Sequence, residues 1–591
     1  MAIKMLPIHE KGPSGSLNSS KMHLKHQWST VGQKILALVT VLSLATVICK
    51  QNYYPLFQAN FIGDPGNPDS LCPIVAKIDP SEHIYDNATI DKILNDPDFR
   101  ARSIERLSSA VKIPTEIYDD TILPNAAKSK KDLYKLEPLW EEYEKFHKFL
   151  KKAFPLIHKS LKVEEVNKFG LIYTWEGSDK KKEPLMLTAH MDVVPVQKET
   201  IDQWTYPPFS GEYDGEFMYG RGVSDCKNLL IGLLETIELF LEEGEFKPER
   251  TLILGFGYDE ESGGTGAGEI YKVLIERYGE ESLYAIIDEG NEAFEKIQGL
   301  NFILPATGEK GHLNSIIELY TPGGHSSVPP NHTSIGILSK LIDLIEENPY
   351  DSILTNANPV LNQLQCVAEH SKTVEKTLKR DILQAQFNPS ANQAVIDFIS
   401  KDSTRYLVAT SQAVDIIQGG AKSNALPEHV SVLINHRIAI EESVSSTAGK
   451  ILEHVKDIAQ KFDLGVVYEG DELVKPTARG YFNYTLNEPL EPSPITPIND
   501  KVWETFGGSL RYFYEDLLFP EKDEIFIPAP YISIGNTDTK NYWPLTKHIF
   551  RYSPGIEGGS NIHSVDEKVK FDVHLQAIAF FYYYIQLVDS E

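Results

Sequence analysis

The stretch "LMLTAHMDVVP", residues 185–195, decides the fold class of this chain. Its apolar run is typical of a buried β-strand, and the strand ends at His190, two positions before Asp192. Such polar groups are either a core histidine beside a turn aspartate or functional groups at the edge of a sheet. The rest of the chain decides between these two interpretations.

Length and charge limit the classes of protein to consider. The 591 residues predict two to four domains, at roughly 100–200 residues per domain. The formal net charge of -27 argues against nucleic-acid binding, because contacts to phosphates need clustered Lys and Arg. We therefore expect a globular protein without a nucleic-acid partner.

The cysteines predict no thiolate zinc site. None of the four, Cys49, Cys72, Cys226 and Cys366, belongs to a CxxC pair. A bridge between Cys72 and Cys366 requires that the chain enter the secretory route, and the sequence leaves this open.

The N-terminal region predicts a membrane anchor. Residues 35–49, "ILALVTVLSLATVIC", carry no charge, and more basic residues precede this run than follow it. We therefore expect a cytosolic tail over 1–34, a signal anchor over 35–52, a stalk over 53–84 and a lumenal body. A cleaved signal peptide is the alternative, but the residues ahead of the run are many for one. Acceptor triplets for N-glycosylation begin at Asn87, Asn331 and Asn483.

The body of the chain is predicted to be an α/β fold that is interrupted by a second domain. Over 85–309, short β-rich segments alternate with helical ones, which predicts a mostly parallel sheet covered on both faces. Residues 310–484 predict a βαββαβ order typical of a ferredoxin-like domain, with a helical insertion at about 345–405. The α/β pattern returns over 485–591. We therefore expect a first domain that is split by an inserted one.

Four predicted strands or their following loops end in groups that bind metals or move protons. These groups are His190 with Asp192, then Asp225, then Asp259-Glu260-Glu261, and finally Asp288-Glu289. The carboxyl ends of parallel strands share one edge of a sheet, so these side chains should gather there. Gathered carboxylates repel one another unless cations lie between them.

The residue types indicate which cation. Nitrogen and oxygen ligands without thiolate suit zinc, with cobalt or manganese as substitutes. Two ions that share one carboxylate need about five ligands and lower the pKa of a water between them. A further carboxylate must then move the proton of that water, and Glu260 beside Glu261 is suited to this.

The motifs also carry a family resemblance. In order, "AHMDVVP", "YGRGVSDCKN", "DEESGGTGA", "IDEG", "TPGGHSSVPP", "SNALP" and "SIGNTDTKNYW" resemble the signatures of the M20 metallopeptidases. The similarity covers about 85–591. It implies a split zinc-peptidase catalytic domain with an inserted lid, which also serves dimerisation in relatives, so a homodimer is open.

The resemblance implies a role for each residue of the centre. Two Zn²⁺ per subunit would be held by His190, Asp225 as the bridging carboxylate, Glu261, Asp288 and, in "NIHSVDEKV", His563. Glu289 is the alternative to Asp288. Asp192 would orient His190 through the second ring nitrogen, and Glu260 would be the general base. Many members have Asn where this chain has Asp566.

Further residues would contact the substrate. His325 matches a group that stabilises the oxyanion, and in dimeric relatives it comes from the partner subunit. Arg437 matches an arginine that binds the free carboxylate of the substrate, although an exposed charge at a strand edge is an equal alternative. Asn424 and Asn536 are similarly placed. Cys226 is expected to serve packing only.

The resemblance implies a membrane-anchored di-zinc carboxypeptidase that acts on small peptides. It would lie in a vacuole or lysosome-like lumen as a single-pass type II protein, or be released by cleavage of the anchor. One alternative keeps the site but makes the enzyme an N-acyl amino acid amidohydrolase or synthase. Another alternative, a non-catalytic binding domain with a decayed site, would lack a ligand or the base.

Overall fold

The computed structural model describes residues 70–79, 88–292, 294–522, 524–556 and 559–591. The predicted tail, the anchor over 35–52 and most of the stalk lie outside these ranges. Of the helices within them, none is long and apolar enough to cross a bilayer.

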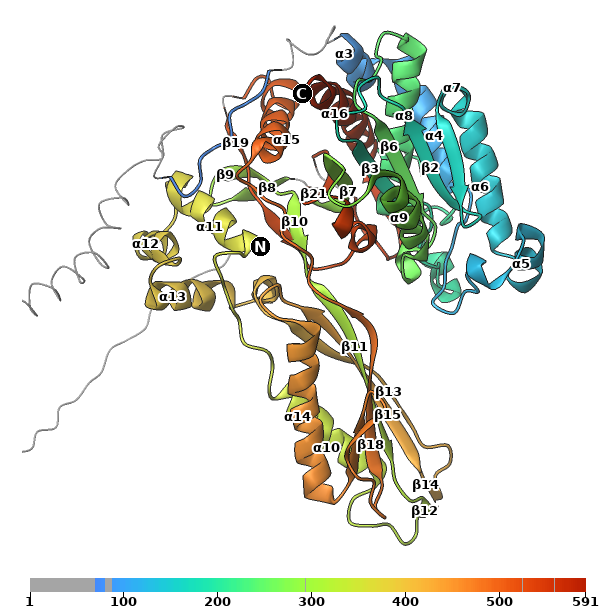
Figure 1. Cartoon of the computed structure of the whole chain (residues 1–591), viewed down its shortest axis with the longest axis vertical. Coiled ribbons are helices and arrows are strands. Elements are labelled where there is room, and N and C mark those ends of the chain that lie inside the picture. Colours follow the sequence, from blue (N-terminus) through green and yellow to red (C-terminus); the bar gives the residue numbers. More distant parts are fainter. Residues whose placement is uncertain (1–69, 80–87, 293, 523, 557–558) are drawn as a thin grey trace, which may run out of the picture. The chain divides into compact units, whose positions relative to one another are not determined.

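A mixed eight-stranded sheet forms the centre of the first part of the fold (Figure 1). Its order is β1 (Lys162–Val166), β2 (Gly170–Trp175), β6 (Leu252–Gly257), β3 (Leu185–His190), β7 (Ala285–Glu292), β21 (Ile549–Ser553), β10 (Ala306–Glu309) and β20 (Tyr531–Ser533).

The expectation of a mostly parallel sheet holds for the middle of this sheet and for the edge pair β10 and β20, but the sheet as a whole is mixed. Strands β6, β3, β7 and β21 are parallel neighbours, whereas β1, β2 and β6 pair antiparallel, and so do β21 and β10. Parallel neighbours need a long crossover connection. Strands β1 and β2 are instead joined by a tight turn in which Asn167 and Lys168 have positive φ, so they form an antiparallel hairpin.

Alternation along the strands divides the core between the two faces of the sheet. Leu185 and Leu187 of β3 belong to one buried cluster, and Met186 between them belongs to another. The first cluster includes residues of α4 (Pro97–Val111), α6 (Trp140–Ala153), α8 (Asn228–Glu243), α15 (Lys501–Tyr512) and α16 (Phe571–Ser590). The second includes residues of α9 (Thr265–Tyr278). Both faces are therefore covered, and the ends of the strands stay free for function.

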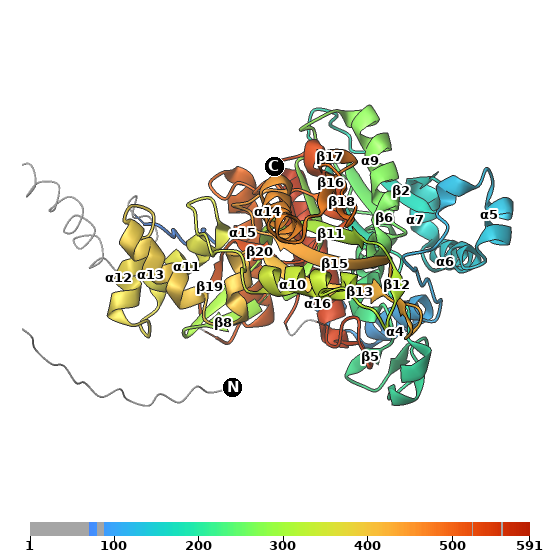
Figure 2. The ribbon, with the colours of Figure 1, turned by 90° about the horizontal axis from the view of Figure 1, so that it is seen from below.

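A second, six-stranded sheet is built from the segment between β10 and β20. Its order is β13 (Ser411–Gly419), β15 (His429–Ile438), β11 (Gly311–Tyr320), β18 (Tyr481–Leu490), β16 (Gly465–Tyr468) and β17 (Asp471–Val474). Helices α10 (Ser334–Glu346) and α14 (Val444–Phe462) lie along it (Figures 1 and 2). Every second residue of β11 is buried, and these residues share a core with the two helices.

The strand that completes this sheet differs from the expected one. The segment at 465–468 does form β16, but the neighbour of β11 is β18, and the predicted boundary at 484 falls inside that strand. Its alternation is readable from Tyr481 to Leu486, while the Asn-Glu-Pro that follows predicts a turn. Pairing with β11 over its full length overrides that local preference.

Three helices occupy the expected helical insertion. They are α11 (Pro359–His370), α12 (Lys376–Gln384) and α13 (Pro389–Ile399), and they share a small core of their own. A disulfide joins Cys366 of α11 to Cys72 in the described segment 70–79. The carboxylate of Glu369 accepts hydrogen bonds from the N–H groups of Leu71 and Cys72, at 2.7 and 3.2 Å. The start of the described chain is thus fixed to the insertion.

Replacing Cys366 with Ser should lower the free energy of unfolding by about 2–5 kcal/mol, because the disulfide closes a very long loop in the unfolded chain. Calorimetry with and without reductant measures the change in Tm. Reductant should bring the wild-type Tm to that of Cys366→Ser and leave the variant unchanged. Equal Tm values for all four samples would show that the bond contributes no stability.

Candidate metal centre

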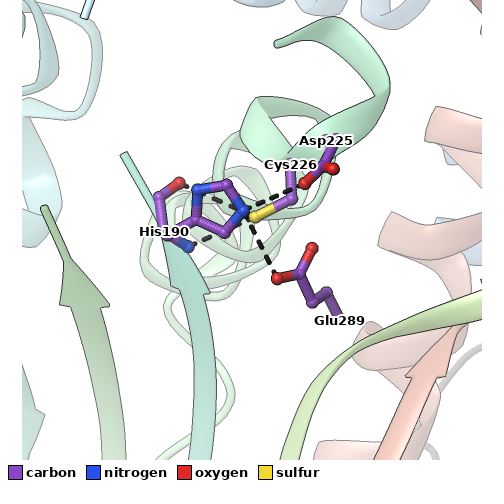
Figure 3. Close-up of side chains that lie close together, drawn as sticks. All are labelled: His190, Asp225, Cys226 and Glu289. Atoms are coloured by element: carbon purple, nitrogen blue, oxygen red, sulfur yellow. Dashed lines mark hydrogen bonds and ion pairs between the residues drawn. The ribbon is translucent and has the colours of Figure 1, made fainter. Parts of the chain in front are cut away.

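His190 is held in one orientation at the end of β3. Its Nδ1 lies 3.0 Å from the backbone oxygen of Asp192, which only accepts, so Nδ1 carries the hydrogen. Its Nε2 then faces two carboxylates, with Asp225 Oδ1 at 3.0 Å and Glu289 Oε1 at 3.3 Å (Figure 3). The predicted orienting role of Asp192 is thus exercised mainly by its backbone oxygen, with Oδ1 at 3.4 Å from Nδ1.

Asp225 stands between two imidazoles. Its second oxygen, Oδ2, lies 3.0 Å from His563 Nε2, and the same nitrogen lies 3.2 Å from Glu261 Oε2. Two groups of candidate ligands therefore share Asp225, and within each group the donor atoms all lie within 4.8 Å of one another. Segments separated by more than 300 residues are brought together here.

The structure places Glu289, and not Asp288, in the first group. Both follow the apolar run of β7, but successive residues of a strand point to opposite sides. Asp288 is buried, and its Oδ2 has no hydrogen-bond partner among the described residues. The preference for Asp288 over Glu289 is therefore corrected.

Cys226 also lies in the first group but as a buried thiol (Figure 3). Its sulfur accepts a hydrogen bond from the backbone N–H of His190 at 3.2 Å. Burial raises the pKa of this thiol well above its ordinary value. Only the thiolate form of cysteine is a good metal ligand. The buried thiol of Cys226 therefore packs the segment of Asp225 against the end of β3 at His190.

Two side chains of the cluster have raised pKa values. Burial raises the pKa of Glu289 to about 8. Hydrogen bonds to Asp225 and Glu261 raise the pKa of His563 to about 10. Divalent cations between these groups would offset the mutual repulsion of the carboxylates, and would bind in competition with protons.

The donor set and its spacing fit zinc. Ligands of one tetrahedral zinc, at 2.0–2.2 Å from the ion, lie roughly 3.3 Å apart. The nitrogen-to-oxygen separations of 3.0–3.3 Å in both groups are close to this value. In addition, Oε1 of Glu261 is buried without a hydrogen-bond partner among the residues described.

The short helical turn η5 (Glu260–Ser262) follows β6 and carries both Glu260 and Glu261. Asp259 caps α9, because its carboxylate accepts hydrogen bonds from the N–H groups of Thr265 and Gly266. Glu261 contacts His563 and its N–H donates to Asp192 Oδ2 at 2.9 Å. Glu260 belongs to neither ligand group, and burial raises its pKa well above the ordinary value.

The sequence did not identify Asp538 as a neighbour of the candidate metal centre. It is buried, and both of its oxygens are without hydrogen-bond partners among the described residues. A methyl group at Gly257 would lie 2.3 Å from its Oδ2, and one at Gly264 would lie 2.8 Å from its Oδ1. It therefore packs directly against the turn that carries Glu260. The motif "SIGNTDTKNYW" contains it, but nothing in the sequence distinguishes it from the neighbouring polar residues.

Arg437 and Asn536 form a pair. Nη1 of Arg437 donates to Oδ1 of Asn536 at 2.9 Å, and Nδ2 of Asn536 donates to the backbone oxygen of Lys310 at 2.6 Å. The negative charge of Glu260 acts on Arg437, although burial lowers the arginine's pKa overall. The guanidinium is therefore near the centre and is not an isolated charge at a strand edge.

His325 and Asn424 form another pair, away from Arg437. Strand β12 (Gly324–His325) pairs with β14 (Ala425–Leu426), and the N–H of Ser326 donates to the backbone oxygen of Asn424 at 3.3 Å. They lie just past the Tyr320–His429 end of β11 and β15, whereas Arg437 lies at the other end (Figure 1). Ten-residue strands separate these ends by roughly 30 Å. His325 is exposed, and its Nδ1 accepts from Ser327.

Comparison with known proteins agrees with this geometry. The model of Peptidase family M20/M25/M40 matches residues 186–587. Carboxypeptidase S of Saccharomyces cerevisiae is 44% identical over 526 residues, which is 88% of this chain and 89% of that protein. The N-fatty-acyl-amino acid synthase/hydrolase of Homo sapiens is 30% identical over 498 residues, covering 82% and 88% of the two chains.

Solved structures show the same fold. A di-peptidase of Saccharomyces cerevisiae superposes with a TM-score of 0.55 at 15% identity, covering 85% of this chain and 98% of that one. An M20 family metallo-carboxypeptidase from Sulfolobus solfataricus gives 0.54 at 17% identity, covering 83% and 99%. On the family match and the similarity to its relatives, the chain belongs to peptidase family M20/M25/M40, a family of hydrolases.

Proposed function

We propose that this protein is a di-zinc carboxypeptidase that removes C-terminal residues from small peptides. The observation that carries the proposal is the pair of ligand groups that share Asp225, with Arg437 within electrostatic reach of Glu260. The similarity to carboxypeptidase S supports the choice of substrate.

The ligands divide between two ions. His190, Asp225 and Glu289 would hold one zinc, and Asp225, Glu261 and His563 the other. Bound zinc supplies a Lewis acid and lowers the pKa of a coordinated water to about 7. The first group is more buried than the second, in which the side chain of His563 is 51% exposed, so substrate would approach from the side of the second group.

Glu260 is the general base of the proposed mechanism. It adjoins a ligand but is not one, so its carboxylate is free to accept a proton from the attacking water. It then returns that proton to the nitrogen of the leaving amino group. Burial raises its pKa above the ordinary value, which is the direction that strengthens a carboxylate as a base.

Arg437 accounts for the exopeptidase activity. A guanidinium binds a carboxylate through two parallel hydrogen bonds, and Asn536 holds Arg437 in place through Nη1. A substrate with a free terminal carboxylate would therefore be placed with its last amide bond beside Glu260.

His325 points to a homodimer. The proposed mechanism uses both Arg437 and His325, but these two residues lie at opposite ends of the second sheet. His325 would therefore stabilise the oxyanion only in the centre of a second copy of the chain, together with Asn424.

The cellular setting is inferred from two features. The Cys72–Cys366 disulfide fits an oxidising compartment, as the lumen of the secretory route is. We infer a vacuolar or lysosome-like lumen, reached as a single-pass type II protein through the predicted signal anchor at 35–52 and compatible with later release and glycosylation.

An N-acyl amino acid amidohydrolase or synthase is the second candidate. The similarity to the human N-fatty-acyl-amino acid synthase/hydrolase favours it. Both substrate types carry an amide next to a free carboxylate, so the same residues serve either. Comparing a blocked dipeptide with a fatty-acyl amino acid as substrates decides between the two.

Glu289→Gln should lose at least half of the bound zinc, because it removes a charged ligand of the first group. Asp288→Asn, which changes the neighbouring carboxylate, should keep the full amount. Elemental analysis of both variants after dialysis measures this. The reverse result would restore Asp288 as the ligand.

Glu260→Gln should reduce kcat by about 10²–10⁴-fold, since it removes the proton-transferring group and no ligand. Zinc content and Tm should match those of the wild type. Steady-state kinetics on the preferred substrate gives kcat, and turnover at the wild-type rate would exclude Glu260 from the mechanism.

Arg437→Lys should lower kcat/KM for a substrate with a free carboxylate by about 10–100-fold, because a lysine cannot make the bidentate contact. The same substrate with an amidated C-terminus should be a poor substrate for both forms. If the variant and the wild type cleave the free acid equally well, Arg437 does not bind the carboxylate.

A further inference from the structure

Glu567 is buried four residues after His563, and its carboxylate accepts hydrogen bonds from the loop that ends at Asp225. Oε2 accepts from Nη1 of Arg221 at 2.6 Å and from the N–H of Gly222 at 3.1 Å. Oε1 accepts from the N–H groups of Ser224 at 2.9 Å and of Asp225 at 3.2 Å. One side chain thus holds the backbone of the shared metal ligand.

The two loops also contact each other at points other than the side chain of Glu567. Strand β22 (Lys568–Lys570) pairs antiparallel with β5 (Phe217–Tyr219). The loop of Asp225 follows β5 and the loop of His563 precedes β22, so both loops adjoin the same end of this pair of strands. The N–H of Gly220 donates to the backbone oxygen of Glu567 at 3.0 Å. A methyl group at Gly559 would lie 1.3 Å from Oγ of Ser224, so only glycine fits there.

We propose that Glu567 is a positioning residue that sets Asp225 relative to His563 and thereby the affinity of the second ligand group for its metal. This inference rests on the proposed metal centre. His563 and Glu567 belong to the same loop, and Asp225 lies on the loop that Glu567 holds. Any displacement between the loops therefore changes the distance from Asp225 Oδ2 to His563 Nε2, which is 3.0 Å.

The arrangement of donors makes a carboxylate necessary. Donors face both oxygens of Glu567, so neither oxygen has room for a proton or an amide hydrogen. In Glu567→Gln, the charge of Arg221 would retain the amide oxygen. The NH₂ group would then face the N–H groups of Ser224 and Asp225, and this repulsion would push the ligand loop away from His563.

The chain offers a matched control in the preceding residue. The carboxylate of Asp566 accepts hydrogen bonds from Thr205, with the N–H at 2.6 Å and Oγ1 at 2.8 Å, and so contacts neither Asp225 nor its loop through its side chain. Its φ is +60°, a conformation that Asn also tolerates. Asp566→Asn removes the same charge from the same loop but leaves the contacts of Glu567 in place.

The test is zinc binding by the metal-free full-length protein, measured by equilibrium dialysis and elemental analysis. We expect the wild type and Asp566→Asn to bind two Zn²⁺ with the same affinities. In Glu567→Gln the dissociation constant of the more weakly bound Zn²⁺ should rise about 10–100-fold. The Tm of the metal-free variant reports separately on folding.

Two results would overturn the inference. If folded Glu567→Gln binds both ions as the wild type does, Glu567 does not set the ligand geometry. If Asp566→Asn weakens zinc binding equally, the loss of any charge in this loop is sufficient. A wild type that binds no zinc would instead refute the proposed metal centre itself.

A second variant keeps the test decisive if Glu567→Gln does not fold. Glu567→Asp retains the buried charge beside Arg221, but its side chain is one methylene shorter and cannot also reach Ser224 and Asp225. Its zinc affinity should fall in the same direction. Wild-type affinity in folded Glu567→Asp would show that the ion pair with Arg221 is the whole function of the residue.

Discussion

The centre depends on the contacts of Asp225, whose two oxygens face His190 and His563 on opposite sides. Glu261 and Glu289 complete the two groups, so three carboxylates lie within a few ångströms of one another. Such a cluster is strongly repulsive where water is excluded. Burial raises the pKa of Glu289, hydrogen bonds to Asp225 and Glu261 raise that of His563, and divalent cations between the carboxylates would offset their repulsion.

The sheet makes this convergence possible because it fixes the directions from which the ligands come. His190 ends β3, Glu289 lies within the neighbouring parallel strand β7, and Glu261 lies in the turn after β6, on the other side of β3. The core on both faces leaves these strand ends little freedom. By contrast, Asp225 and His563 lie on loops outside the sheet. The side chain of Glu567, on the loop of His563, accepts hydrogen bonds from the backbone of the loop of Asp225 and so holds the two loops together.

Part of the candidate site was predictable because three of its candidate ligands follow a local signal, whereas His563 was assigned only through the family resemblance. The apolar runs before His190, Glu261 and Glu289 identify buried strands, and acidic residues directly after them are unusual for turns alone. Asp288 and Glu289 could not be distinguished in this way, because both follow the same run and only the direction of the strand separates them. The relation of His325 to Arg437 was equally hidden, since it depends on the register of β11 against β15.

The sequence by itself determined the family, the existence of a split α/β unit with a second sheet inserted, and the residue types of a metal centre, because motifs and periodicity are local properties. Only the tertiary structure decided that the large sheet is mixed, that β18 is the neighbour of β11, that Cys72 bonds Cys366 and that Glu289 faces His190. These features result from pairings between residues far apart in the chain. Such pairings are selected by the packing of the whole fold, and no single segment carries them.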